Sequence, residues 1–211
     1  MDRYGDEWWG ASRRVTGIAL LAPPIGGILV AAAAENATLY RRLVHEDSLL
    51  EWLSVVAWIV GLVAAVLVAW RTRGLERVLW ILFALACLAA AGEELSWGQR
   101  LFDYGTPDAF RDSDKQEEAA LHNLSWAESP TRLAIIAVSV AGAVAPWFTR
   151  RVPRFLVPAF AVSALYEVVR LPAGDDPDYR FARYAEWPEL CFAGALAALA
   201  VWTLRRLESP P

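Results

Sequence analysis

Histidine and cysteine are scarce in this chain of 211 residues, which contains two of each. Two histidines cannot form a three-histidine zinc site. Neither histidine lies inside an apolar run, which also disfavours a haem buried between helices. Cys87 and Cys191 fall inside apolar runs at what should be different depths, so we expect packing residues rather than a disulfide framework. No basic patch that would bind nucleic acid is present.

Long apolar blocks dominate the rest of the chain. Hydrophobic residues make up 56% of the sequence, 11 residues are tryptophan, and the apolar blocks are bounded by arginine and tryptophan. This composition predicts an all-α integral membrane protein that crosses the bilayer several times. The net charge of −4 says little about partners, because charge in such a protein is divided between the two sides of the membrane.

The apolar blocks predict a six-helix transmembrane bundle that forms a single membrane domain, residues 1–211. A polar connection after the third span predicts an amphipathic helical segment, about 106–126, lying on the membrane surface. The six expected spans are about 15–34, 49–70, 75–97, 133–148, 155–171 and 187–204.

The first span carries an unusual centre. Pro23 and Pro24 remove backbone donors, and two glycines follow, so we expect this helix to kink or break there and to bend toward the functional site. A secretory signal peptide is the alternative, since two arginines precede the apolar run and Ala32 and Ala34 resemble a cleavage site. The run is too long for a signal peptide, which favours a retained span.

Six spans place both termini on one side of the membrane. The short basic turn from Thr149 to Arg154 predicts that this side is cytoplasmic, because positive charge in short loops sets orientation. Most acidic residues then lie on the outer face. We therefore expect a multi-pass protein of the cell membrane, of the bacterial inner-membrane type, with both termini in the cytoplasm.

The stretch Gly92 to Arg100, Gly-Glu-Glu-Leu-Ser-Trp-Gly-Gln-Arg, puts two carboxylates about one helical turn inside the end of an apolar run. Ionisable groups there are costly and are usually functional. Adjacent helical residues point about 100° apart, so Glu93 should share a face with Ser96 and Trp97 while Glu94 points elsewhere. The small residues Ala86, Ala89 and Ala90 should bring the Glu93 face against other helices.

These features define a candidate site at the outer interface. For each residue alone, an ordinary helix cap or a solvated charge is the simpler explanation; Asp47 or Ser48, with Glu51 following, also fits a capping box. As a set, we expect Glu93, His122 and Glu94 to be catalytic and the following residues to bind substrate: Glu51, Ser96, Trp97, Gln99, Arg100, Asn123 and Glu189. A divalent metal is an open alternative, with candidate ligands Glu93, His122 and Asp47.

The Gly92 to Arg100 stretch followed by Leu121-His122-Asn123 resembles a pattern in uncharacterised multi-pass bacterial membrane proteins. This resemblance covers about thirty residues and implies no particular activity. Glu46-Asp47 with Glu51-Trp52 also resembles the acidic first motif of the alkaline ceramidases. Those enzymes use three zinc histidines, including a late pair, and the sixth span here has none.

Three functions fit this site. The favoured one is an enzyme, a hydrolase or transferase, that acts on a membrane lipid or lipid-linked substrate at the outer leaflet, with a carboxylate as general base and His122 as its partner. A non-catalytic subunit or assembly factor that binds a membrane protein partner is the alternative. An ion- or proton-coupled transporter fits less well, because the central part of every span is free of charge.

Overall fold

The computed structural model describes residues 11–33, 36–44, 48–102, 125–171 and 184–208. Every regular element in these ranges is a helix. The long helices are α2 (Arg13–Ala33), α4 (Leu49–Arg71), α5 (Gly74–Glu94), α8 (Ser125–Val144), α9 (Val157–Arg170) and α10 (Glu186–Glu208). Shorter elements join them: α3 (Ala37–Val44), η1 (Ser96–Gly98), α6 (Gln99–Phe102), η3 (Ala145–Trp147) and η4 (Arg154–Leu156).

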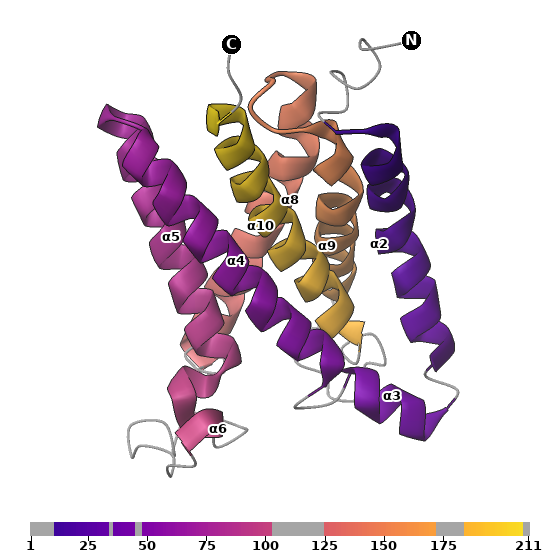
Figure 1. Cartoon of the computed structure of the whole chain (residues 1–211). Coiled ribbons are helices and arrows are strands. Elements are labelled where there is room, and N and C mark those ends of the chain that lie inside the picture. The colour runs from indigo at the N-terminus through magenta and orange to yellow at the C-terminus, as the bar shows by residue number, and fades with distance from the viewer. Residues whose placement is uncertain (1–10, 34–35, 45–47, 103–124, 172–183, 209–211) are drawn as a thin grey trace.

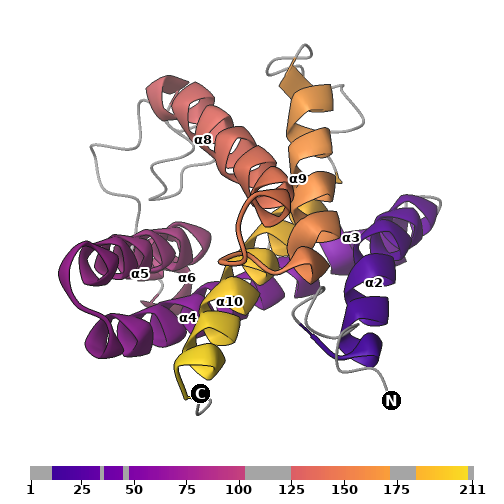
Figure 2. The same cartoon turned by 90° about the horizontal axis from the view of Figure 1, so that it is seen from above.

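The six long helices run up and down between the same two ends of the molecule (Figure 1). The start of α2 and the end of α10 lie at one end, while α3 and α6 lie at the other. Seen from above, α4 and α5 form a pair on one side, and α8, α9 and α2 lie around α10 on the other (Figure 2). The helix α10 packs on both α4 and α9 and so joins the two groups.

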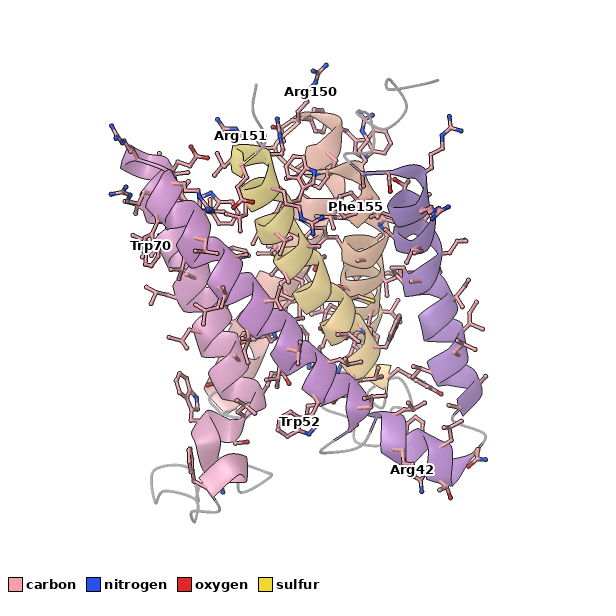
Figure 3. The ribbon with its side chains drawn as sticks, viewed as in Figure 1. Arg42, Trp52, Trp70, Arg150, Arg151 and Phe155 are labelled. Carbon is pink, nitrogen blue, oxygen red and sulfur yellow. The ribbon has the colours of Figure 1, made fainter. Side chains whose placement is uncertain are left out.

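Five helical stretches are long and apolar enough to cross a membrane: Arg13–Ala33, Leu49–Arg71, Gly74–Glu94, Pro130–Trp147 and Glu186–Glu208. Large apolar side chains point outward along them, for example Ile28, which is 68% exposed. On α4, Trp52 and Trp70 lie near opposite ends of the helix (Figure 3). They are separated by about 27 Å of helix, close to the roughly 30 Å of a bilayer core. Tryptophans at these positions fit the two membrane interfaces.

Small residues permit the close packing of α4, α5 and α10. A β-carbon at Gly61 of α4 would lie 3.2 Å from the Sγ atom of Cys87 in α5 and 3.5 Å from the Cα atom of Ala197 in α10. The buried positions of α10 include Ala193, Ala195, Ala197 and Ala200. Close backbone approach through small residues is the usual way in which helices associate in a bilayer.

Helix boundaries near the middle of the chain differ from the sequence prediction. The third helix ends at Glu94 rather than at Trp97. The fourth begins at Ser125 and contains Pro130, so Trp126 belongs to α8 and not to a surface helix. Most of the predicted surface helix, about 106–126, lies outside the described residues. The fifth apolar run forms η4 followed by α9, which has 14 residues.

Two packing predictions differ from the structure. A kink or a break was predicted at Pro23 and Pro24, and the break does not occur, because α2 continues from Arg13 to Ala33. The kink stays a prediction. The side of α5 that faces other helices carries Ala84, Cys87 and Ala91, whereas Ala86 and Ala89 are exposed. The buried side of α5 is therefore not the side that was predicted to bring Glu93 against other helices, because α5 packs mainly along α4.

Candidate functional site

The Gly92 to Gly98 motif forms a tight corner at the end of α5. The Trp97 ring folds back over Gly92, where a β-carbon would lie 3.0 Å from its atoms. From this position the Trp97 Nε1 donates a hydrogen bond to the Glu93 Oε1. Glu93 and Trp97 therefore meet as predicted, but through the turn at Ser96 and Trp97 and not as neighbours on one helix face, because α5 ends at Glu94. Glu93 and Glu94 are both partly exposed, and Ser96 is fully buried.

The corner holds two consecutive residues in a left-handed conformation that costs energy. The φ angles of Ser96 and Trp97 are 46° and 52°, and that of Gly98 is 92°. For a residue other than glycine this region costs roughly 1–2 kcal/mol. Such outliers concentrate at functional sites and persist only where the surroundings enforce them.

Glu51 enters the same end of the bundle from the first turn of α4. Ser48 is the N-cap of this helix, and its side-chain oxygen accepts a hydrogen bond of 3.3 Å from the Glu51 backbone nitrogen. The Ser48 half of the predicted capping box is confirmed. Glu51 itself is 9% exposed, so the residue as a whole is largely covered by protein.

The most deeply buried carboxylate of the described chain belongs to Glu167 on α9. Glu167 is 4% exposed, and its Oε2 lies 3.7 Å from the Nε of Arg132 on α8. Both side chains are about nine-tenths buried, with exposed fractions of 6% and 10%. A buried ion pair is weak evidence for a stabilising role, because desolvation offsets much of the attraction.

Three further polar side chains surround this ion pair. Arg170 on α9 and Glu189 on α10 both interact electrostatically with Glu167. Tyr166, beside Glu167 in sequence, is hydrogen-bonded to Arg170. The Nε atom of Arg170 is buried and makes no hydrogen bond to the described residues. Two guanidinium groups and two carboxylates therefore balance in charge at one place, with a phenol beside them.

Packing between α9 and α10 fixes the position of this cluster. The hydroxyl of Ser163, one turn before Glu167, lies 2.8 Å from the Pro188 carbonyl oxygen and can donate to it. Pro188 immediately precedes Glu189, so this bond sets the height of Glu189 relative to Glu167. Trp187, the residue before Pro188, contacts α2, where its Nε1 donates a hydrogen bond of 2.9 Å to the Pro23 carbonyl oxygen. We call Arg132, Tyr166, Glu167, Arg170 and Glu189 the α9 cluster.

The described site residues lie in three places. The corner after α5 holds Glu93, Glu94, Ser96, Trp97 and Gln99. Glu51 lies in the first turn of α4 and Glu189 belongs to the α9 cluster. His122, Asn123 and Asp47 lie outside the described residues, as does the side chain of Arg100. In the part of the chain that the structure describes, no three His, Cys, Asp or Glu side chains form a group suited to a metal ion.

Arg132, Tyr166, Glu167 and Arg170 were not among the catalytic, substrate-binding or metal-binding residues predicted from sequence. Glu167 and Arg170 were visible as two charges spaced three apart near the end of an apolar run, which places them on one helix face. Arg132 follows Pro130 at the start of the next apolar stretch. One span thus begins with a positive charge, and the next span ends with a negative charge. This pattern could have indicated that Arg132 and Glu167 lie close together.

Comparisons with protein-family models, with curated proteins and with solved structures gave no match for this chain.

Proposed function

We propose that this chain is an enzyme of the cell membrane that acts on a lipid or lipid-linked substrate at the outer leaflet. In this proposal all six long helices cross the bilayer and both termini are cytoplasmic. The observation that carries it is the buried Glu167 with Arg132, Arg170, Tyr166 and Glu189 beside it. Ionisable groups at membrane depth are costly and are usually kept for function.

The distribution of charge supports the orientation. The end of the bundle that holds the start of α2 and the end of α10 is rich in arginine, and Arg150 and Arg151 project from it (Figure 3). The described arginines there are Arg13, Arg14, Arg71, Arg73, Arg77, Arg150, Arg151, Arg154, Arg205 and Arg206. Among the described acidic residues, this end has Glu76 and Glu208. An arginine excess of this kind is typical of the cytoplasmic side.

Hydrolysis or group transfer on a lipid substrate needs a proton acceptor and groups that hold the substrate, and the α9 cluster supplies both. Glu167 lies three residues before the end of α9, which is about 4.5 Å along the helix axis. This end of α9 is at the opposite side of the bundle from the arginine-rich end. In the proposed reaction its carboxylate accepts a proton from the attacking hydroxyl or water. The guanidinium groups of Arg132 and Arg170 hold an anionic group of the substrate, and Tyr166 donates to it.

The corner after α5 is the second part of the proposed site. Glu93 is held by Trp97, and His122, which follows on the next connection, remains its proposed partner. The strained Ser96 and Trp97 backbone supports a functional role for this motif.

A non-catalytic subunit is the second candidate. The observation that favours it is the outward side of α5, where Ala86 and Ala89 are exposed. Small residues on a surface that faces the bilayer permit close approach of a helix from another protein.

Turnover of lipid is the direct test. The purified protein is reconstituted into vesicles of a bacterial inner-membrane lipid extract, and the lipids are compared before and after incubation by untargeted mass spectrometry. We expect a product with the wild type and none with Glu167→Gln. Glu76→Gln, an exposed carboxylate at the arginine-rich end, is the matched control and should behave as wild type. The absence of any product dependent on the wild-type protein would contradict the enzyme and favour the subunit.

A further inference from the structure

A groove runs between α4 and α5 on the side of the bundle away from the α9 cluster. Its volume is about 440 Å³, which lies within the usual range for ligand sites. The lining residues are Leu62, Val66, Ala69 and Trp70 of α4 and Arg77, Ile81, Ala84, Leu85 and Leu88 of α5. Arg77 is the single charged residue in this lining.

The shape of the groove follows from residue size. Ala69 and Ala84, which are 4% and 5% exposed, form its floor. The larger side chains of Ile81, Leu85 and Leu88 are each about half exposed and form its rim. Small residues below and large ones beside them leave an apolar channel on the surface that faces the bilayer.

The length of the groove matches one leaflet of a bilayer. Arg77 lies at the arginine-rich end, and Leu88 lies eleven residues further along α5, or about 16 Å of helix. Half of a typical hydrocarbon core is about 15 Å. The groove therefore extends from the headgroup level at Arg77 to about the middle of the bilayer.

The geometry of Arg77 prepares it for an anion. Its Nε atom lies 3.0 Å from the Ala69 carbonyl oxygen and 2.9 Å from that of Thr72, the C-cap of α4. These bonds fix the guanidinium plane at the mouth of the groove. The four N–H donors of the two Nη atoms make no hydrogen bond to the described residues, and they match the oxygens of a phosphate.

From these features we infer that the groove binds an anionic phospholipid, with one acyl chain between α4 and α5 and the phosphate on Arg77. Arg73 lies near the same headgroup position, whereas Arg71 is already paired with Glu208 at 2.9 Å. Glu76 lies beside Arg77 in sequence, and in this inference the Nη donors of Arg77 at the mouth of the groove supply the preference for an anionic headgroup. This site is separate from the proposed enzymatic site and does not depend on it.

Native mass spectrometry of the full chain in mild detergent tests this inference. Phosphatidylglycerol and phosphatidylcholine are titrated separately, and apparent dissociation constants are compared. We expect the wild type to bind phosphatidylglycerol about fivefold more tightly, the effect of roughly one additional cationic contact at a membrane surface. Arg77→Gln should lose this preference, whereas Arg150→Gln, an exposed arginine outside the groove, should retain it.

A second pair of variants keeps Arg77 in place. Leu85→Trp fills the rim of the groove and should weaken binding of both lipids. Leu21→Trp alters a leucine of similar exposure on α2 and should have no effect. Equal affinities of the wild type for the two lipids would overturn the inference. So would equal effects of the two arginine variants, or of the two tryptophan variants.

Discussion

The indole of Trp187 lies against α2 at the position where two prolines interrupt its backbone donors. Its Nε1 donates a hydrogen bond of 2.9 Å to the Pro23 carbonyl oxygen, and its ring occupies the space that a β-carbon on Gly26 would need. The proline segment of α2 is thereby fixed to the first turn of α10, next to Glu186 and Glu189. A polar partner from a neighbouring span is the expected compensation for irregular backbone bonding inside a membrane.

Replacing Gly26 with alanine should separate α2 from α10. The added methyl group overlaps the Trp187 ring, and overpacking of this kind costs typically about 1–3 kcal/mol. The measurement is the apparent melting temperature in detergent, which should fall for Gly26→Ala. Gly17→Ala is the control on the same helix, since nothing lies within 4 Å of its β-carbon position. An equal fall for both variants would show that Trp187 and α2 are not in close contact.

Orientation can be tested with single cysteines at Thr149 and Asp176. The native Cys87 and Cys191 are 1% and 7% exposed, so they should give little background labelling. An impermeant thiol reagent on intact cells should label Asp176→Cys and not Thr149→Cys, because the arginine-rich end is expected to be cytoplasmic. Both positions should react once the cells are opened. Labelling only at Thr149 in intact cells would reverse the proposed orientation.

Apolar runs were sufficient to predict most of the long helices. Leu49–Arg71, for example, ends one residue from the predicted boundary, and its N-cap is Ser48, one of the two residues predicted for that position. The corner after α5 could not be predicted in the same way, because nothing local favours a left-handed Ser96 and Trp97. The fourth span was predicted to begin at about residue 133, but α8 begins at Ser125 and includes Pro130.

The α9 cluster was only partly predictable, for a different physical reason. Sequence spacing places Glu167 and Arg170 on one face of a helix near its end. It does not say which helix that face meets, because every span has a similar apolar surface. The pairing of Glu167 with Arg132 depends on α8 packing beside α9, and the position of Glu189 depends on the bond between Ser163 and Pro188. The pairing of Glu167 and the position of Glu189 are therefore both determined by tertiary packing.

The corner after α5 gives a prediction about Glu93. Glu93→Gln and His122→Ala should each abolish lipid turnover while leaving the apparent melting temperature near that of the wild type. The double variant should be no worse than either single one, because the two groups are proposed to act as a unit. Trp97→Phe keeps the ring over Gly92 but removes the hydrogen bond to Glu93, so it should reduce turnover to a smaller extent. Full turnover by Glu93→Gln would remove Glu93 from the proposed site.

Because the α9 cluster contains two arginines and two glutamates, paired substitutions can distinguish effects on stability from effects on lipid turnover. Glu167→Gln leaves two arginines with one glutamate, and Arg132→Gln leaves two glutamates with one arginine. Each change leaves a buried charge without compensation, which costs roughly 3 kcal/mol or more. The double variant restores the balance with Arg170 and Glu189, so it should be more stable than either single variant.

The most direct measurement is therefore lipid turnover and melting temperature together for the wild type, Glu167→Gln, Arg132→Gln and the double variant. If the carboxylate of Glu167 is the proton acceptor, the double variant regains stability but stays inactive. If the ion pair only holds α8 against α9, turnover returns together with stability. Recovery of turnover in the double variant would contradict the proposed role of Glu167.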